Sequence, residues 1–344
     1  FYLNSAIMGT THDLDWLEQH VEPGEELTIR NVTDDLGLLG VTGPRSRKLL
    51  STLTDADLTN ESFRWLTARE IDVAGVPCTA LRVSYVGELG WELHFPIERM
   101  PELYDAIVAA GEPLGLIHFG AYAMNVMRLE KGYKAWGSEL TTEITPIEAR
   151  LERFVDFDGE FLGKNVVVAR REQREPLSMV LVYCEVDTTD NDVRGNEPAY
   201  DSSGKVMGVA TSGAWGHSVG KSLAFVYVAP EFEAPGSTFQ LEMLGEMRTA
   251  TVLADPAYDP GNEALRAKAS QCRTSHVVAP VGEPAGSPTA RRRWPSTSAR
   301  FGPGCREAAT GHSRNGTSSR STTRRSPCSR TWGWARRCRS SCRW

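Results

Sequence analysis

Tyr85 and Glu92 are the two side chains of this sequence whose types and spacing best fit the binding of a small flat ligand. They lie within residues 82–95, where apolar and polar side chains alternate on both sides of the Gly87-Glu88 dipeptide. Alternation of this kind predicts two antiparallel strands, and a glycine-containing dipeptide between them predicts a tight turn. The segment is therefore expected to form a hairpin.

The register of this hairpin decides what the two side chains can do. A tight turn pairs Val83 with Glu92 and Tyr85 with Gly90, so that Tyr85 and Glu92 share one face as diagonal neighbours about 7–8 Å apart. A carboxylate can accept two parallel N–H bonds from a 2-amino-4-oxo-pyrimidine edge, and a phenol can pack on a ring while keeping a polar tip. Gly90 would leave room for the ring. From the residues alone, a cross-strand Tyr and Glu are more often a structural or solvated pair.

A second candidate is Trp136, which follows a predicted helix end within residues 128–137. The helix end would deliver Trp136 either to the rim of a pocket or into the core, and the sequence leaves both open. Arg128 and Glu130 are two residues apart and cannot pair on one helical face.

Other motifs exclude several classes of function. Residues 211–221 are rich in glycine and hydroxyl side chains and are expected to form a loop between strands, but they lack the order of a phosphate-binding loop. The sequence contains no G-x-S-x-G elbow and no G-x-G-x-x-G fingerprint, so hydrolase and dinucleotide-binding readings have no support. The histidines show no ligand spacing, and no metal site is expected.

The order of the predicted elements indicates an α+β domain of split-βαβ type, followed by a small all-β barrel. We expect the first domain over residues 1–170 and the barrel over 175–259, joined by a charged linker at 169–175. Helices are predicted at 12–20, 44–53, 100–110 and 121–130, and strands of the first domain at 27–32, 36–41, 71–73 and in two segments of 77–95. Barrel strands are predicted at 177–186, 205–210, 223–228, 238–244 and 249–254.

Composition is that of a globular protein, with 40% hydrophobic and 24% charged residues among 344. No apolar run approaches the roughly 18–20 residues of a membrane-spanning helix, so no membrane association is expected. The net charge of −6 is unevenly distributed, because the part before Arg273 carries −19 and the part from Arg273 onward carries +13.

Residues 270–344 have an unusual composition. They contain no Leu, Ile, Met, Lys, Asp or Tyr, and they hold five of the seven cysteines. We expect this segment to be disordered and to result from translation in another frame beginning near Ala269; the alternative is a genuine basic tail that binds nucleic acid. Cys78 and Cys184 lie within strand patterns as small apolar residues, which indicates a reduced, cytosolic-type protein.

Eleven short motifs occur together in a fixed order between Phe1 and about Asp259. They include Ser84-Tyr-Val-Gly-Glu-Leu-Gly-Trp-Glu-Leu93 and Arg128-Leu-Glu-Lys131, and the full set lies at 12–14, 35–44, 57–58, 84–93, 119–125, 128–131, 135–137, 145–148, 161–164, 211–213 and 221–224. In these motifs the chain resembles the glycine-cleavage T-protein (aminomethyltransferase) family. It is most similar to the C-terminal tetrahydrofolate module of dimethylglycine and sarcosine dehydrogenases and oxidases.

The resemblance implies a folate domain and a β-barrel that enclose tetrahydrofolate. It also implies that Tyr85 and Glu92 are the family's pterin-contacting pair and that Trp136 stands where T-proteins carry an aromatic contact to the cofactor. Met124 falls where T-proteins carry an arginine, which favours the dehydrogenase branch. Arg150 stands where the family has glycine, which raises a question about local packing.

The function implied is capture of a one-carbon unit from oxidised dimethylglycine or sarcosine, with formation of 5,10-methylenetetrahydrofolate. Tetrahydrofolate and a donor derived from a small N-methyl amine are the expected partners, without nucleic acid, in the cytoplasm or, in a eukaryote, the mitochondrial matrix. The family's catalytic acid and the FAD module would lie upstream of Phe1, so we expect a fragment whose own turnover stays open. The alternatives are an aminomethyltransferase acting on a lipoyl-bound carrier and a non-enzymatic folate-binding regulator, whose K-x-x-C motif is absent here.

Overall fold

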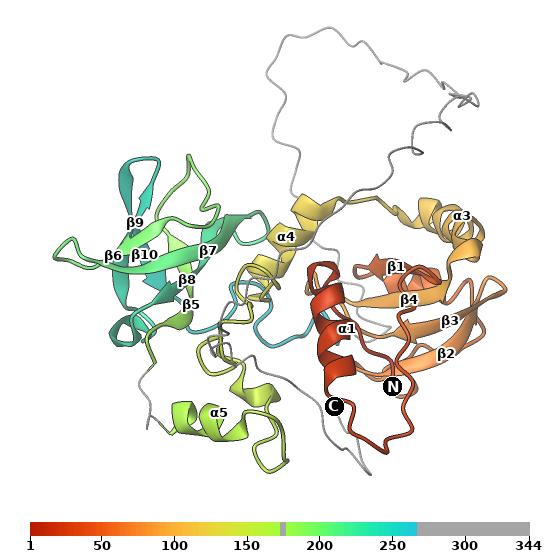
Figure 1. The fold of residues 1–344 in the computed structure, drawn as a ribbon. Coiled ribbons are helices and arrows are strands. Elements are labelled where there is room, and N and C mark those ends of the chain that lie inside the picture. Colours follow the sequence, from red (N-terminus) through yellow and green to blue (C-terminus); the bar gives the residue numbers. More distant parts are fainter. Residues whose placement is uncertain (173–176, 267–344) are drawn as a thin grey trace, which may run out of the picture. The chain divides into compact units, whose positions relative to one another are not determined.

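A four-stranded antiparallel sheet and a closed six-stranded barrel form the framework of the chain (Figure 1). The structure is a computed structural model that describes residues 1–172 and 177–266. The first part contains α1 (Thr10–Gln19), β1 (Leu36–Thr42), α2 (Ser46–Leu50), β2 (Ala68–Val73), β3 (Val76–Leu81), β4 (Gly90–Pro96), α3 (Met100–Gly111), α4 (Ala121–Glu130) and α5 (Lys164–Arg171). The barrel contains β5 (Val180–Val186), β6 (Pro198–Tyr200), β7 (Val206–Gly216), β8 (Lys221–Val228), β9 (Thr238–Met243) and β10 (Glu246–Val252). The prediction of an α+β part followed by a small β-barrel is confirmed.

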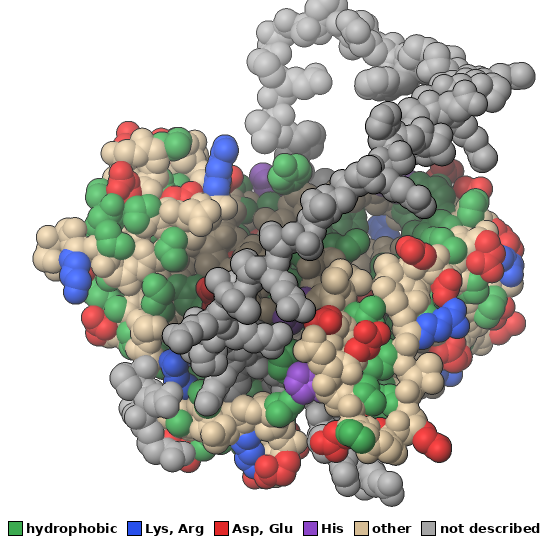
Figure 2. All heavy atoms as spheres, viewed as in Figure 1, with side chains coloured by type: hydrophobic (Ala, Val, Ile, Leu, Met, Phe, Trp, Pro, Cys, Tyr) green, Lys and Arg blue, Asp and Glu red, His purple; other side chains and the backbone are tan. Residues whose placement is uncertain are grey.

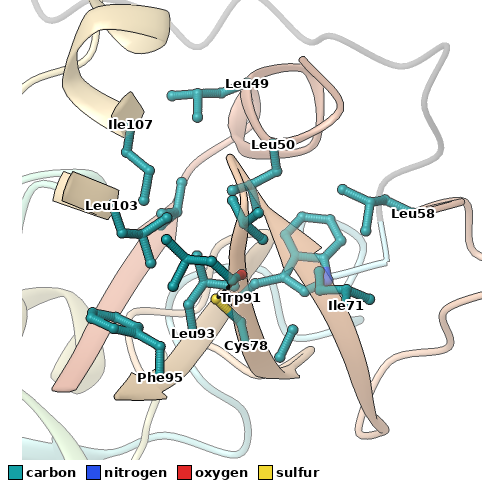
Figure 3. Packing of buried hydrophobic residues seen from close by; sticks show 14 of the residues in the cluster. Leu49, Leu50, Leu58, Ile71, Cys78, Trp91, Leu93, Phe95, Leu103 and Ile107 are labelled. Atoms are coloured by element: carbon teal, nitrogen blue, oxygen red, sulfur yellow. Dashed lines mark hydrogen bonds between the residues drawn. The ribbon is translucent and has the colours of Figure 1, made fainter. Parts of the chain in front are cut away.

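The sheet has the order β1-β4-β3-β2, so β4 is an inner strand with neighbours on both sides. Its side chains Trp91, Leu93 and Phe95 alternate onto one face and are at most 1% exposed. Leu50 of α2 and Leu103 of α3 pack into the same cluster, as Figure 3 shows. Because strand side chains alternate, Glu92 and His94 must lie on the other face of the sheet.

The predicted tight hairpin is wrong in its register. β3 ends at Leu81, which pairs with Glu92, and residues 82–89 form a long connection. Beyond Leu81 the chain keeps its contact with the β2 side only, where the N–H of Arg82 donates to Thr67 O at 2.9 Å. The Arg82 side chain is 1% exposed and donates to the carbonyl of Phe63, which holds the connection against the domain.

The barrel is closed by antiparallel pairing around the order β10-β5-β8-β7-β6-β9. All five predicted strands are present, whereas the three-residue β6 is missed by the sequence because it is too short to show alternation. The expected loop at 211–221 is also wrong. Residues 211–216 continue β7, with a register shift between Ala210 and Ser212, and only 217–220 turn between the strands.

Other outcomes in the first part are mixed. The helix predicted at 12–20 is confirmed as α1, whereas the strand predicted at 27–32 is absent and this segment has no regular structure. Arg150 adopts a left-handed backbone with φ of 56°, a conformation that glycine adopts more readily than a residue with a side chain. The expectations for 270–344 lie outside the described residues.

Figure 2 shows acidic and basic side chains interspersed over the described surface on the side in view. Within residues 1–172 and 177–266, no helix combines the length and the apolar character needed to cross a bilayer.

Candidate functional site

Glu92 offers a carboxylate on the sheet face opposite the core. It lies in the middle of β4, directly across from Gly40 on β1 and Leu81 on β3. Its side chain is 29% exposed, and Oε2 lies 3.7 Å from Nε2 of His94. A half-buried carboxylate held on an inner strand is well placed to accept hydrogen bonds from a ligand that lies on the sheet.

The open space beside Glu92 comes from Gly40. A Cβ added to Gly40 would meet no atom within 4 Å, whereas a Cβ on Gly90 would lie 2.9 Å from Thr42 Cγ2. Gly90 pairs with Thr42 on β1, so the expectation that Gly90 makes room opposite Tyr85 is wrong. Paired residues of antiparallel strands share a face, and Gly40 therefore leaves a flat area open next to the carboxylate.

Tyr85 lies in the connection after β3 and contacts the turn that follows α4. Its hydroxyl donates a hydrogen bond to Lys134 O at 3.0 Å, and its ring stacks on Tyr133 with 6.2 Å between centroids. Burial raises the pKa of Tyr85 above its ordinary value of 10, so the phenol stays neutral. The side chain is half-buried and is held in place by both contacts.

Behind this connection, Glu88 accepts a hydrogen bond from the hydroxyl of Tyr258. Burial raises the pKa of Glu88, and the nearby charge of Asp259 acts in the same direction. Lys131, which is 1% exposed, pairs with the Asp259 carboxylate at 2.9 Å. The residues that follow the barrel therefore hold the connection from behind.

Trp136 lies in the turn after α4 and is 39% exposed, so it is not a core residue. A buried ion pair fixes this turn, with Arg128 Nη1 2.8 Å from Glu139 Oε2 and the two side chains 1% and 0% exposed. Arg128 also donates to Tyr133 O at 3.0 Å, and Glu139 accepts from the backbone N–H of Ala135 at 2.7 Å.

Glu139 also joins the turn to the barrel. Its Oε1 accepts hydrogen bonds from the hydroxyls of Thr211 and Ser212 on β7, and its backbone carbonyl accepts one from Tyr227 at 2.8 Å. Every oxygen of this buried residue thus has a donor, which makes the turn that carries Trp136 a rigid platform.

The N-terminal segment contacts both β4, which carries Glu92, and the turn that carries Trp136. The hydroxyl of Tyr2 lies 2.8 Å from Nδ1 of His94, next to Glu92. Met8 lies against Gly137, where an added Cβ would fall 2.2 Å from the Met8 methyl.

The three side chains singled out by the sequence do not touch. Among residues 1–172 and 177–266, no hydrogen bond, ion pair or ring contact joins Tyr85, Glu92 and Trp136 to one another. Tyr85 contacts the turn at 133–139, which carries Trp136. The N-terminal segment contacts this turn and also β4, which carries Glu92. Within the same residues, no group of three His, Cys, Asp or Glu could hold a metal ion.

The sequence missed Gly40, His94 and Glu139. Gly40 precedes Glu92 by 52 positions and meets it only because β1 pairs with β4. A buried guanidinium requires a carboxylate as its partner, and this requirement of Arg128 was the one indication of an acidic residue such as Glu139.

The two parts of the chain match the two domains of a known family. Residues 1–159 match the GCVT N-terminal domain, and residues 180–259 match the glycine cleavage T-protein C-terminal barrel domain. The chain therefore belongs to the glycine cleavage T-protein family, and the resemblance seen in the sequence is confirmed.

Two kinds of relatives share this family. The mitochondrial dimethylglycine dehydrogenase of Homo sapiens is 40% identical over 279 residues, a match that covers 80% of this chain and 32% of that protein. An aminomethyltransferase from Natranaerobius thermophilus is 32% identical over 263 residues, covering 76% of this chain and 70% of the relative. The chain thus spans about a third of the length of the dehydrogenases, which are 32%, 30% and 30% covered.

The fold has a solved counterpart. The crystal structure of glycine cleavage system aminomethyltransferase T from Bartonella henselae matches with a TM-score of 0.60 and 23% sequence identity. This match covers 73% of the present chain and 67% of that structure. At this identity the likeness establishes the fold alone.

Proposed function

We propose that this chain binds tetrahydrofolate and that Glu92 holds the 2-amino-4-oxo edge of its pterin ring. The observation that carries the proposal is the partly exposed carboxylate of Glu92 on the inner strand β4. It lies beside the open area over Gly40 on the neighbouring strand β1. A carboxylate has about four lone-pair sites and can accept two parallel N–H bonds from this edge. The acceptor sites of the carboxylate thus fit the N–H groups of a pterin.

The aromatic side chains fit the rest of the ligand. Tyr85 stays neutral and is held by Lys134 O and the Tyr133 ring, so its remaining ring surface can pack on the ligand. Trp136 is partly exposed on the turn that the Arg128–Glu139 pair makes rigid. Aromatic side chains that are already held rigidly lose little conformational freedom when a ligand binds, which reduces the entropic cost of binding.

Bound tetrahydrofolate would supply the nitrogen nucleophile that captures a one-carbon unit and becomes 5,10-methylenetetrahydrofolate. The contribution of this chain is to orient the pterin through Glu92 and to exclude water with Tyr85 and Trp136. Identity to dimethylglycine dehydrogenase supports oxidised dimethylglycine or sarcosine as the source of this unit, with FAD chemistry in a module outside this sequence.

A second candidate is an aminomethyltransferase of the glycine cleavage type. The specific observation in its favour is that the chain covers 70% of the Natranaerobius thermophilus aminomethyltransferase. Both candidates use the same pterin contacts, and they differ in the donor of the one-carbon unit. The cytoplasm, or the mitochondrial matrix in a eukaryote, is the compartment we propose, since the mammalian relatives are named as mitochondrial.

Isothermal titration of the chain with tetrahydrofolate under anaerobic conditions tests the proposal. Glu92→Ala should weaken binding by about tenfold or more, because a hydrogen bond to a charged group contributes about 1.5–3 kcal/mol. Glu98→Gln is the control, since this exposed carboxylate lies just beyond β4 and should leave the affinity unchanged. Equal affinity of wild type and Glu92→Ala would remove the assignment.

A further inference from the structure

His94 is a buried imidazole directly behind the proposed pterin contact. It lies two residues beyond Glu92 on the same face of β4 and is 5% exposed. Its Nε2 is buried and makes no hydrogen bond to the described residues, and it lies 3.7 Å from Glu92 Oε2. A buried polar atom without a hydrogen-bond partner lowers the stability of the folded chain, so the orientation of Nε2 towards Glu92 calls for an explanation.

The other ring nitrogen identifies the tautomer. The hydroxyl of Tyr2 lies 2.8 Å from Nδ1 of His94, and the two rings stand nearly perpendicular at 89°. Burial raises the pKa of Tyr2, and the charge of Glu92 raises it further, so the phenol keeps its proton. A protonated phenol can donate to Nδ1, and a neutral ring that accepts this bond carries its N–H on Nε2, on the side of Glu92.

The flanking strands offer Nε2 no better partner. His94 pairs with Leu38 on β1 and with Thr79 on β3. Leu38 is apolar, and Nε2 makes no hydrogen bond to the Thr79 hydroxyl, which donates to Glu70 at 2.7 Å. The Glu92 carboxylate lies 3.7 Å from Nε2.

We propose that His94 is a positioning residue for Glu92, an inference that rests on the proposed tetrahydrofolate site. The Nε2–H donates to Glu92 Oε2 and fixes the plane of the carboxylate, which leaves its remaining lone pairs for the two N–H groups of the pterin edge. Tyr2 keeps His94 in the tautomer that can do this. The distance of 3.7 Å shortens to a hydrogen bond when the ligand draws the carboxylate into its plane, as often happens between ligand-free and bound sites.

Substitutions at position 94 separate positioning from packing. In anaerobic titration with tetrahydrofolate, His94→Leu keeps the volume but removes the donor and should weaken binding about tenfold. His94→Gln keeps an N–H donor at a similar reach and should bind within about threefold of wild type. Tyr2→Phe should weaken binding severalfold in the wild-type background and have no effect in the His94→Leu background. A purely structural role would give no rescue by glutamine.

The tautomer is measured without any ligand, by long-range ¹H–¹⁵N correlation of the histidine rings at pH 8. The signal of His94 is assigned by its loss in His94→Gln. The Nε2–H form is expected; the Nδ1–H form overturns the inference, as does an unchanged affinity of His94→Leu. If wild type does not bind tetrahydrofolate at all, the proposed function fails, whereas binding that depends on Glu92 but not on His94 removes this inference alone.

Discussion

The buried ion pair between Arg128 and Glu139 gives the sharpest prediction about stability. Glu139→Ala leaves the Arg128 guanidinium, which is 1% exposed, without its carboxylate. The same change removes the acceptor for the Ala135 N–H and for the hydroxyls of Thr211 and Ser212 on β7. The turn that carries Trp136 then loses its fixed connection to the barrel.

The size of the effect follows from this environment. Removing one partner of a buried ion pair costs about 3–5 kcal/mol, because the other charge is left uncompensated. Donors that lose their acceptor in a buried site add about 1 kcal/mol or more each. We therefore expect Glu139→Ala to lower the free energy of unfolding by at least about 4 kcal/mol.

Urea unfolding followed by tryptophan fluorescence measures this change through the shift of the midpoint. Glu160→Ala is the matched control, since it breaks an i,i+4 pair with Lys164 at 3.1 Å in which Glu160 is 89% exposed. An exposed pair contributes 0–1 kcal/mol, so this variant should unfold close to wild type. If Glu139→Ala were no more destabilised than Glu160→Ala, the argument for a rigid platform would be refuted.

Three further predictions concern other parts of the chain. Gly40→Leu should fill the open area beside Glu92 and weaken tetrahydrofolate binding by more than tenfold in titration while leaving the melting temperature within a few degrees; Gly40→Ala should give a smaller loss, and wild-type affinity of Gly40→Leu would contradict the placement of the ligand. Leu244 has φ of 52° in the exposed β9–β10 turn, so Leu244→Asn should stabilise the chain by about 0.5–1 kcal/mol in thermal unfolding, and a lower melting temperature would be unexpected. The pKa of Glu88 is raised in the folded state, so protonated Glu88 stabilises the folded chain at low pH, and this stabilisation is lost as the pH rises through the pKa of the folded state. Glu88→Gln should therefore become more stable relative to wild type as the pH rises above about 4.5. A stability difference that does not change with pH would argue against burial of the charge.

Local patterns predicted most of the fold. The barrel strands alternate strongly enough to be located from the sequence, and α1 was found from its spacing of leucines. The hairpin register was wrong because the alternation of side chains continues beyond Leu81, whereas the pairing of β3 with β4 ends at Leu81. A pattern of period two shows which residues can be extended, but it does not show where pairing with the neighbouring strand ends.

The candidate site was predictable only in part. Tyr85, Glu92 and Trp136 were singled out from their types and from the resemblance, and they stay predictions as ligand contacts. Gly40 and the partner of Arg128 depend on pairing between segments far apart in the sequence, which no local pattern encodes. The contact between the Tyr2 hydroxyl and Nδ1 of His94 also requires the folded chain.

The central claim is that the Glu92 carboxylate reads the 2-amino edge of tetrahydrofolate. The most direct measurement is a two-by-two comparison in which wild type and Glu92→Ala are titrated with tetrahydrofolate and with an analogue whose 2-amino group is replaced by methyl. Wild type should prefer tetrahydrofolate by about tenfold or more, and Glu92→Ala should lose most of this preference, because one hydrogen bond to a charged group accounts for both differences. An equal preference in both proteins would show that Glu92 does not contact this edge and would contradict the account.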